Sequence, residues 1–170
     1  MGRSGIEQLL YMMDRTFAAP GPTFGTWHSF LVNLADVRDD DWLWVPEDGE
    51  RTIFDIVQHA GEAKYVYDSR AFGDASMHWE RPGSIPTIEP ATPREEVVRW
   101  LTDGQQRLRE HVAALADDSE LSKMRPGLWG DQHETRWLIT QVIQHDLYHA
   151  GELNHIRALR HKNDDWGNEP

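Results

Sequence analysis

The sequence predicts an all-α protein, built as a four-helix bundle with an additional short N-terminal helix. Long segments place apolar residues three and four positions apart, which is the period of an amphipathic helix. Segments rich in Pro and Gly separate these stretches and predict loops. No stretch shows the convincing alternation of apolar and polar residues that is typical of a half-buried strand. Four long helices around one apolar core favour a bundle.

Two helices are expected in the first part of the chain. Residues 6–17 form the short N-terminal helix, and residues 23–37 form the first bundle helix after a Pro-Gly-Pro turn. The apolar face of this bundle helix contains Phe24, Trp27, Phe30, Leu31 and Leu34. An aromatic-rich turn with the sequence DWLWVP, residues 41–46, then leads towards the second bundle helix.

The second bundle helix has start and stop signals. It follows Thr52, which forms a pattern close to a capping box with Asp55, and it ends at Gly73, a candidate C′ glycine. Residues 74–91 come next, and they are rich in Pro and Gly without a clear period. Loops of this length are uncommon in compact domains and often lie across a functional site.

The remaining two helices are predicted from residue 92 onward. Thr92 is the expected N-cap of the third bundle helix and Pro93 its first helical residue. Its apolar face contains Val97, Trp100, Leu101, Gln105 or Leu108, Val112 and Leu115. After a loop at 117–133, the fourth bundle helix runs from about residue 134 to 160, and residues 163–170 are expected to form a flexible tail.

Composition limits the class of protein. The 170 residues suit a single domain, 1–170, with its core at about 23–160. A net charge of −12 argues against nucleic-acid binding, and the lack of cysteine excludes disulfides, thiolate metal sites and a cysteine nucleophile. No apolar stretch approaches the roughly 20 residues that span a bilayer, and the N-terminus lacks a signal-peptide pattern. We therefore expect a cytoplasmic protein without a membrane partner.

Three histidines are the candidate metal ligands. His145 and His149 are one helical turn apart, so their Cβ atoms lie about 5–6 Å apart on one face. This face is the predicted buried stripe of the fourth helix, which contains Leu138, Val142, His145, His149, Glu152 or Leu153, Ile156 and Leu159. His59 borders the core stripe of the second helix, and facing helices of bundles commonly build metal sites. Three imidazoles would leave positions open for water or substrate, as in catalytic sites.

Alternative interpretations of these residues remain open. A histidine that faces the core is more often hydrogen-bonded within the protein than bound to a metal. Glu152, three residues after His149, is a weak catalytic candidate that could orient a ligand imidazole or bound water, although its position slightly favours an ordinary helix-face carboxylate. Asp146 is about 100° around the helix from His145 and is not expected to be a ligand. His155 is expected at the surface, and the histidines expected in solvent are His28, His78, His111, His133 and His161.

Three stretches resemble the DinB-like superfamily of metal-binding four-helix proteins. They are DWLWVP at 41–46, TIFDIVQHAGEAKYVYDSRAFG at 52–73 and ETRWLITQVIQHDLYHAGELNHIRAL at 134–159. With the spacing between them, the resemblance extends over about residues 23–159. It implies a bundle that binds a divalent metal, zinc or nickel, through His59, His145 and His149.

The resemblance also implies candidate activities. Some members are S-transferases that use mycothiol, bacillithiol or glutathione, and some are maleylpyruvate isomerases with a thiol cofactor. The first hypothesis is therefore a metal-dependent S-transferase for a small thiol, with a substrate that enters under the 74–91 loop between Trp129 and Trp44. The alternatives are a non-catalytic metal-binding or stress-related protein, and a metal-water hydrolase with Glu152 as the base. Members often form homodimers, and the apolar surface of residues 6–17 would be buried in such an interface.

Overall fold

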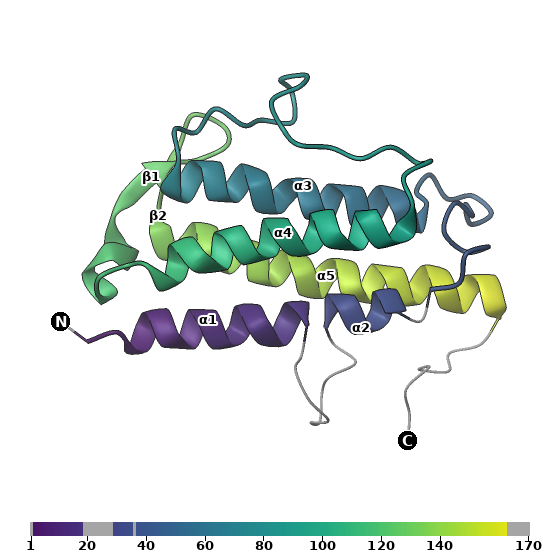
Figure 1. Ribbon diagram of the computed structural model, residues 1–170, viewed down its shortest axis with the longest axis horizontal. Helices are drawn as coiled ribbons and strands as arrows, with labels where there is room; N and C mark the ends of the chain where they lie inside the picture. The colour runs from purple at the N-terminus through teal and green to yellow at the C-terminus, as the bar shows by residue number, and fades with distance from the viewer. Residues whose placement is uncertain (1, 19–28, 36, 163–170) are drawn as a thin grey trace.

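The computed structural model describes residues 2–18, 29–35 and 37–162 (Figure 1). Within these ranges the chain is mostly helical, which confirms the predicted all-α class. The helices are α1 (Ser4–Phe17), α2 (Phe30–Ala35), α3 (Ile53–Phe72), α4 (Arg94–Ala113) and α5 (Thr135–His161). A 3-10 helix, η2 (Asp118–Ser122), and two short strands, β1 (Met124–Pro126) and β2 (Gln132–Glu134), connect α4 to α5.

The helices α1 and α2 follow one another along one side of the bundle, and α3, α4 and α5 form the rest of it (Figure 1). The helix α3 packs along both α4 and α5, while α1 packs on α4 and α5 and α2 packs on α5. The predicted N-terminal helix is therefore part of the bundle. Of the predicted first bundle helix, α2 covers residues 30–35, and residues 23–28 lie outside the described part of the chain.

The apolar core has one cluster around α1 and another around α2. Ile6 and Met13 of α1 are buried against Leu108, Val112, Ile139, Val142 and Ile143. Phe30 and Leu34 of α2 belong to the other cluster, which contains Ile53, Ile56, Val57, Leu101, Leu153 and Ile156. The apolar face of α1, which was expected to be free for a dimer interface, thus packs within its own chain.

A buried ion pair lies in the core between these two clusters. The ammonium of Lys64, whose residue is 0% exposed, donates to both carboxylate oxygens of Asp146 at 2.7 and 2.9 Å and to Gln105 Oε1 at 2.9 Å. The ring of Phe17 lies 4.6 Å from the Lys64 Nζ. Burial raises the pKa of Asp146 and lowers that of Lys64, and the opposite charge of each partner acts against these shifts. Neither residue was predicted to be in the core.

Several local predictions need correction. Pro93, not Thr92, is the residue before α4, because the Thr92 hydroxyl accepts from the Glu89 N–H at 3.1 Å instead of capping the helix. Gly73 ends α3 as expected, but its φ of −108° is not left-handed. Leu159, placed on the buried stripe of α5, is 48% exposed.

The connection at 117–133 also differs from the expectation that the chain has no strand. The strands β1 and β2 pair antiparallel, with Arg125 opposite His133. Each strand has three residues, which is too short for an alternating pattern to be visible in the sequence. None of the helices that the structure describes has the length and apolar character needed to cross a membrane.

Candidate metal centre

The three predicted ligands come together at the contact between α3 and α5. His59 projects from α3, and His145 and His149 project from successive turns of α5. The Nε2 atom of His145 lies 3.1 Å from that of His59 and 3.1 Å from that of His149. One nitrogen of each ring can be chosen so that all three lie within 4.8 Å of one another.

The two 3.1 Å distances from His145 agree with ligands that share one metal ion. Two nitrogens at roughly 2.0–2.1 Å from the same ion lie about 2.9 Å apart at octahedral angles and about 3.3 Å apart at tetrahedral angles. The observed separation of 3.1 Å lies between the two values. The two separations from His145 therefore fit a shared ion and suit both zinc and nickel. All three rings would bind one ion if His59 and His149 approach within about 4.2 Å of each other, inside the 4.8 Å that bounds the set.

Glu152 determines how His149 presents its nitrogens. Its Oε2 lies 2.7 Å from His149 Nδ1, and a carboxylate accepts a hydrogen bond, so we infer that Nδ1 carries the hydrogen. In the neutral ring, Nε2 then presents a lone pair to the other histidines. A carboxylate behind a ligating imidazole is the usual way in which metal-binding histidines are oriented. Glu152 is thus placed to orient a ligand, as the sequence had suggested.

Hydrogen bonds alone do not satisfy the cluster. The Nε2 atom of His145 contacts two other Nε2 atoms, but a neutral imidazole has one N–H and can donate to one of them. A cation held between the three rings would accept a lone pair from each of them. The donor set therefore fits a divalent metal.

Burial keeps the imidazoles neutral. Desolvation, assisted by the charges of His149 and Arg51, lowers the pKa of His59 to about 4. Desolvation and the neighbouring histidines lower the pKa of His145 to about 3. The pKa of His149 is also lowered by desolvation, against the opposing effect of Glu152. Neutral rings are required for metal binding, so the cluster is ready to bind at neutral pH.

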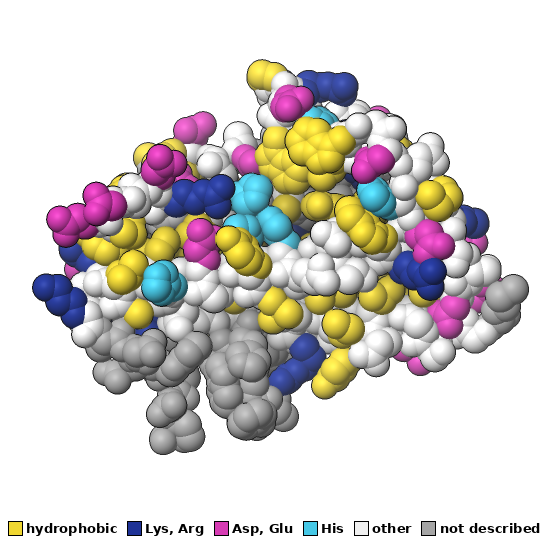
Figure 2. Space-filling model, turned by 180° about the vertical axis from the view of Figure 1, so that it is seen from behind, with side chains coloured by type: hydrophobic (Ala, Val, Ile, Leu, Met, Phe, Trp, Pro, Cys, Tyr) yellow, Lys and Arg dark blue, Asp and Glu magenta, His cyan; other side chains and the backbone are white. Residues whose placement is uncertain are grey.

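The cluster opens to the surface on one side. His149 is 2% exposed, whereas His59 and His145 are half-buried. Figure 2 shows histidine side chains in the middle of one face, with large hydrophobic side chains and a basic side chain next to them. His59 and His145 are therefore partly exposed to solvent, while His149 is covered.

The 74–91 loop covers part of this opening, as its length suggested. Its Trp79 ring lies 5.8 Å from the His59 ring and 6.5 Å from the Tyr67 ring, between ring centres. The loop is held on α3 by residues on either side of His59, because Gln58 donates to the Ile88 carbonyl at 2.7 Å and Glu62 accepts from Thr87 at 2.9 Å. Trp79 was not singled out from the sequence, although it is the tryptophan of the one loop expected to cover a site.

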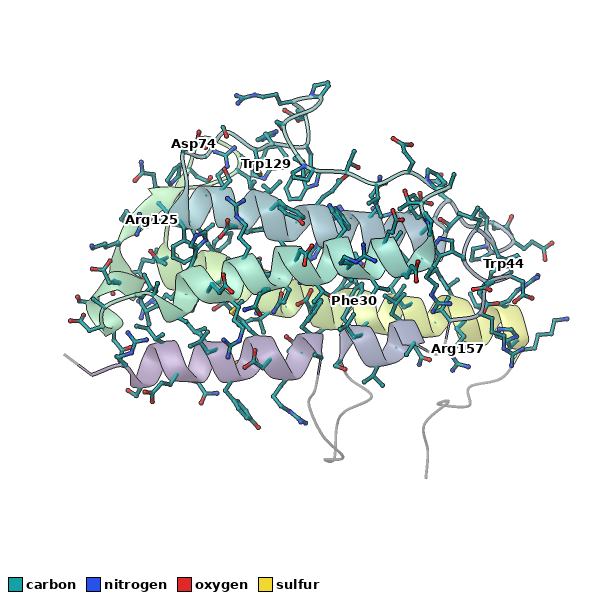
Figure 3. The ribbon with its side chains drawn as sticks, viewed as in Figure 1. Phe30, Trp44, Asp74, Arg125, Trp129 and Arg157 are labelled. Carbon is teal, nitrogen blue, oxygen red and sulfur yellow. The ribbon has the colours of Figure 1, made fainter. Side chains whose placement is uncertain are left out.

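Of the two tryptophans predicted to line the entrance, Trp44 lies elsewhere. The Trp129 ring is 71% exposed and packs on His78 at 5.6 Å between ring centres. Trp44 packs against Arg160. Arg160 lies further along α5 than His149, by about 16 Å at the rise of an α-helix. Figure 3 shows Trp44 and Trp129 far apart on the molecule. Trp44 is therefore not a wall of the site, and Trp129 contacts the loop that covers it.

Four other histidines are partly buried and bonded, so the prediction that they are solvated is wrong. The pairs are His78 with the Leu128 carbonyl (3.1 Å), His111 with Asp68 (2.6 Å), His133 with Asp131 (2.7 Å) and His161 with Asp41 (2.9 Å). His155 is exposed as expected, and His28 lies outside the described residues. Asp146 is not a ligand, but its contact with Lys64 gives it a structural role.

Comparison with known families agrees with this site. The family model of the DinB superfamily matches residues 25–153, a range that includes all three histidines. This chain therefore belongs to the DinB superfamily. The comparison with curated proteins found no match.

Proposed function

We propose that this DinB-superfamily protein binds a divalent metal ion through His59, His145 and His149 and uses the centre to transfer a small thiol. The observation that carries the proposal is the convergence of three neutral imidazole nitrogens in a cluster that is partly exposed to solvent. Zinc and nickel are the proposed metals, because imidazole ligands without thiolate suit both. Mycothiol, bacillithiol and glutathione are the candidate thiols.

The chemistry follows from the ligand set and its surroundings. A divalent metal with three protein ligands keeps positions open and lowers the pKa of a thiol or water bound there, which supplies a nucleophile at neutral pH. Glu152 holds the His149 ring in place at 2.7 Å. Trp79 and Tyr67 give the entrance an apolar boundary on the His59 side, which limits the access of water.

Metal analysis of untagged protein tests the ligand set. We expect about one zinc or nickel ion per chain, and its loss in His59→Ala and His145→Ala, because two remaining imidazoles bind far more weakly. His155→Ala is the matched control, since His155 is an exposed histidine of the same helix. Equal metal content in the wild type and His145→Ala would overturn the ligand assignment.

An assay of thiol consumption tests whether the protein is a thiol S-transferase. Metal-loaded protein is incubated with each candidate thiol and a panel of electrophiles, and the loss of free thiol is followed over time. We expect loss that depends on the metal and disappears in His145→Ala. If no combination reacts, the transferase proposal fails and the non-catalytic metal-binding alternative replaces it.

A metal-water hydrolase is the weaker alternative. Its support is the carboxylate of Glu152, whose side chain is 26% exposed beside the histidines and is therefore accessible to water. The contact of Glu152 with His149 favours an orienting role over that of a general base. The substitution of Glu152 described in the Discussion separates the two roles.

A further inference from the structure

We propose that the centre selects small thiols that carry a carboxylate, and that Arg51 is the cation that binds this carboxylate. The inference rests on the proposed S-transfer and deepens it, because it names the class of thiol. Glutathione and bacillithiol carry carboxylates, whereas mycothiol carries none. The structure thus favours the first two among the candidate thiols.

Arg51 is held next to the metal ligands by local structure. It directly precedes Thr52, the N-cap of α3, whose hydroxyl accepts from the Asp55 N–H at 3.1 Å while Asp55 accepts from the Thr52 N–H at 2.8 Å. This capping box fixes the backbone beside Arg51. The Arg51 Nη1 lies 4.0 Å from Glu152 Oε1, and the other oxygen of Glu152 contacts His149.

The guanidinium retains capacity for a second anion. Its side chain is 53% exposed, and 4.0 Å is too long for a hydrogen bond, so the contact with Glu152 is loose. A guanidinium has five N–H donors in a planar fork that matches a carboxylate. The positive charge of Arg51 also contributes, as one of the smaller causes, to the lowered pKa of all three histidines.

The negative net charge of the chain makes a cation beside the candidate site an indication of an anionic ligand. At a net charge of −12 the protein repels anions in general, so an anionic ligand needs a local positive charge. The surroundings of the histidines differ in character, because the aromatic ring of Trp79 lies against His59 whereas the Arg51 guanidinium lies next to Glu152, which contacts His149. A thiol with a carboxylate can place its sulfur at the metal and its carboxylate at Arg51, while an apolar portion faces Trp79.

The test compares two thiols of the same length that differ in charge. Protein loaded with Co²⁺ is titrated with 3-mercaptopropionate and with 3-mercapto-1-propanol, and binding is followed by the visible absorption of the ion. We expect the acid to bind roughly three- to tenfold more tightly, the range for a partly exposed charge-assisted contact. Butyrate, which has the carboxylate but no sulfur, is expected to bind more weakly than the thiol acid.

Substitutions assign the preference to Arg51. The ratio of the two thiol affinities is the readout, because it is insensitive to a change in metal loading. We expect the ratio to fall to about one in Arg51→Gln and to be partly kept in Arg51→Lys, which retains the charge without the planar fork. Arg99→Gln, at an exposed arginine of α4, is the control and should keep the wild-type ratio.

Failure of the role proposed for Arg51 can be distinguished from failure of the proposed thiol chemistry. Equal affinity of the wild type for both thiols, or an unchanged ratio in Arg51→Gln, would overturn the role of Arg51 and leave S-transfer intact. If neither thiol alters the Co²⁺ spectrum, or if butyrate binds as tightly as the thiol acid, the proposed thiol chemistry itself fails.

Discussion

Glu152 illustrates how a single residue outside the ligand set can control the centre. Its 2.7 Å contact fixes the His149 tautomer, and the negative charge makes the ligand nitrogen more basic. In Glu152→Gln, we expect metal affinity to fall by about 10- to 100-fold, the usual effect of losing such a partner. Competition with a chromogenic chelator measures this change.

Glu62→Gln is the matched control for this prediction. Glu62 is a carboxylate three residues from His59, but it bonds Thr87 of the covering loop. Its substitution should leave metal affinity unchanged. A Glu152→Gln variant with wild-type metal affinity would contradict the orienting role, and loss of hydrolytic activity in that variant would favour Glu152 as a base.

The lowered pKa values of single histidines predict how the metal-free protein responds to acid. The pKa is about 4 for His59 and about 3 for His145, against 6.5 for an ordinary imidazole. As the pH falls below 6.5, the unfolded chain takes up protons on these rings while the folded chain does not. The free energy of unfolding should therefore decrease between pH 6.5 and about 4.

Urea denaturation in the presence of a chelator, at several pH values across this range, measures the slope. The double variant His59→Gln/His145→Gln should show a shallower slope, and an identical slope would contradict the assignment. Because protons compete with the metal only at lower pH, we also expect metal binding to persist below pH 6.5.

At the scale of elements, close packing of α3 on α4 depends on Gly61. A Cβ at this position would lie 2.1 Å from Cζ3 of Trp100, whose ring stacks on Tyr65. Although Ala has the higher helix propensity by roughly 1 kcal/mol, overpacking costs about 1–3 kcal/mol, so Gly61→Ala should destabilise the bundle.

Gly151 in α5, unlike Gly61, has space for a larger side chain. A Cβ there would meet no atom within 4 Å, so Gly151→Ala should be neutral or stabilising by up to about 1 kcal/mol. Equilibrium unfolding in urea measures both variants. A Gly61→Ala variant as stable as Gly151→Ala would show that Trp100 can move away without cost.

For the whole molecule, the buried pair of Lys64 and Asp146 joins α3 to α5, and the contact of Lys64 with Gln105 adds α4. Removal of one partner leaves an uncompensated buried charge, so Lys64→Met should reduce the free energy of unfolding by about 3–5 kcal/mol. The double variant Lys64→Met/Asp146→Leu removes both charges and should recover much of the loss. Urea denaturation of the two single variants and the double variant completes the cycle, and additive losses would show that the pair is not coupled.

The oligomeric state is also a property of the whole molecule. The homodimer prediction was based on the apolar face of residues 6–17, but Ile6, Met13 and Phe17 are buried within the chain. The exposed apolar side chains of α1 are Tyr11 and Met12, which leave a small surface for self-association. Light scattering at micromolar concentration tests the prediction, and a monomeric mass would end it.

The sequence by itself determined the helical class, the approximate limits of α1, α3, α4 and α5, and the three histidines of the centre. Helical periodicity and terminal signals are local, so they can be read from neighbouring residues. The pair His145 and His149 is local in the same sense, because one helical turn places both rings on one face. The inclusion of His59 depended on the expectation that facing helices of a bundle converge and on the resemblance to the DinB-like superfamily.

Only the tertiary structure decided which distant residues surround that centre. Trp79, Arg51 and the pair of Lys64 and Asp146 each depend on contacts between segments far apart in the chain. The opposite charges of Lys64 and Asp146 lie at positions three and four residues from buried apolar neighbours, which is a signal that sequence inspection could have used. No local pattern states which loop residue will lie over His59, because the packing of the whole bundle sets the path of that loop.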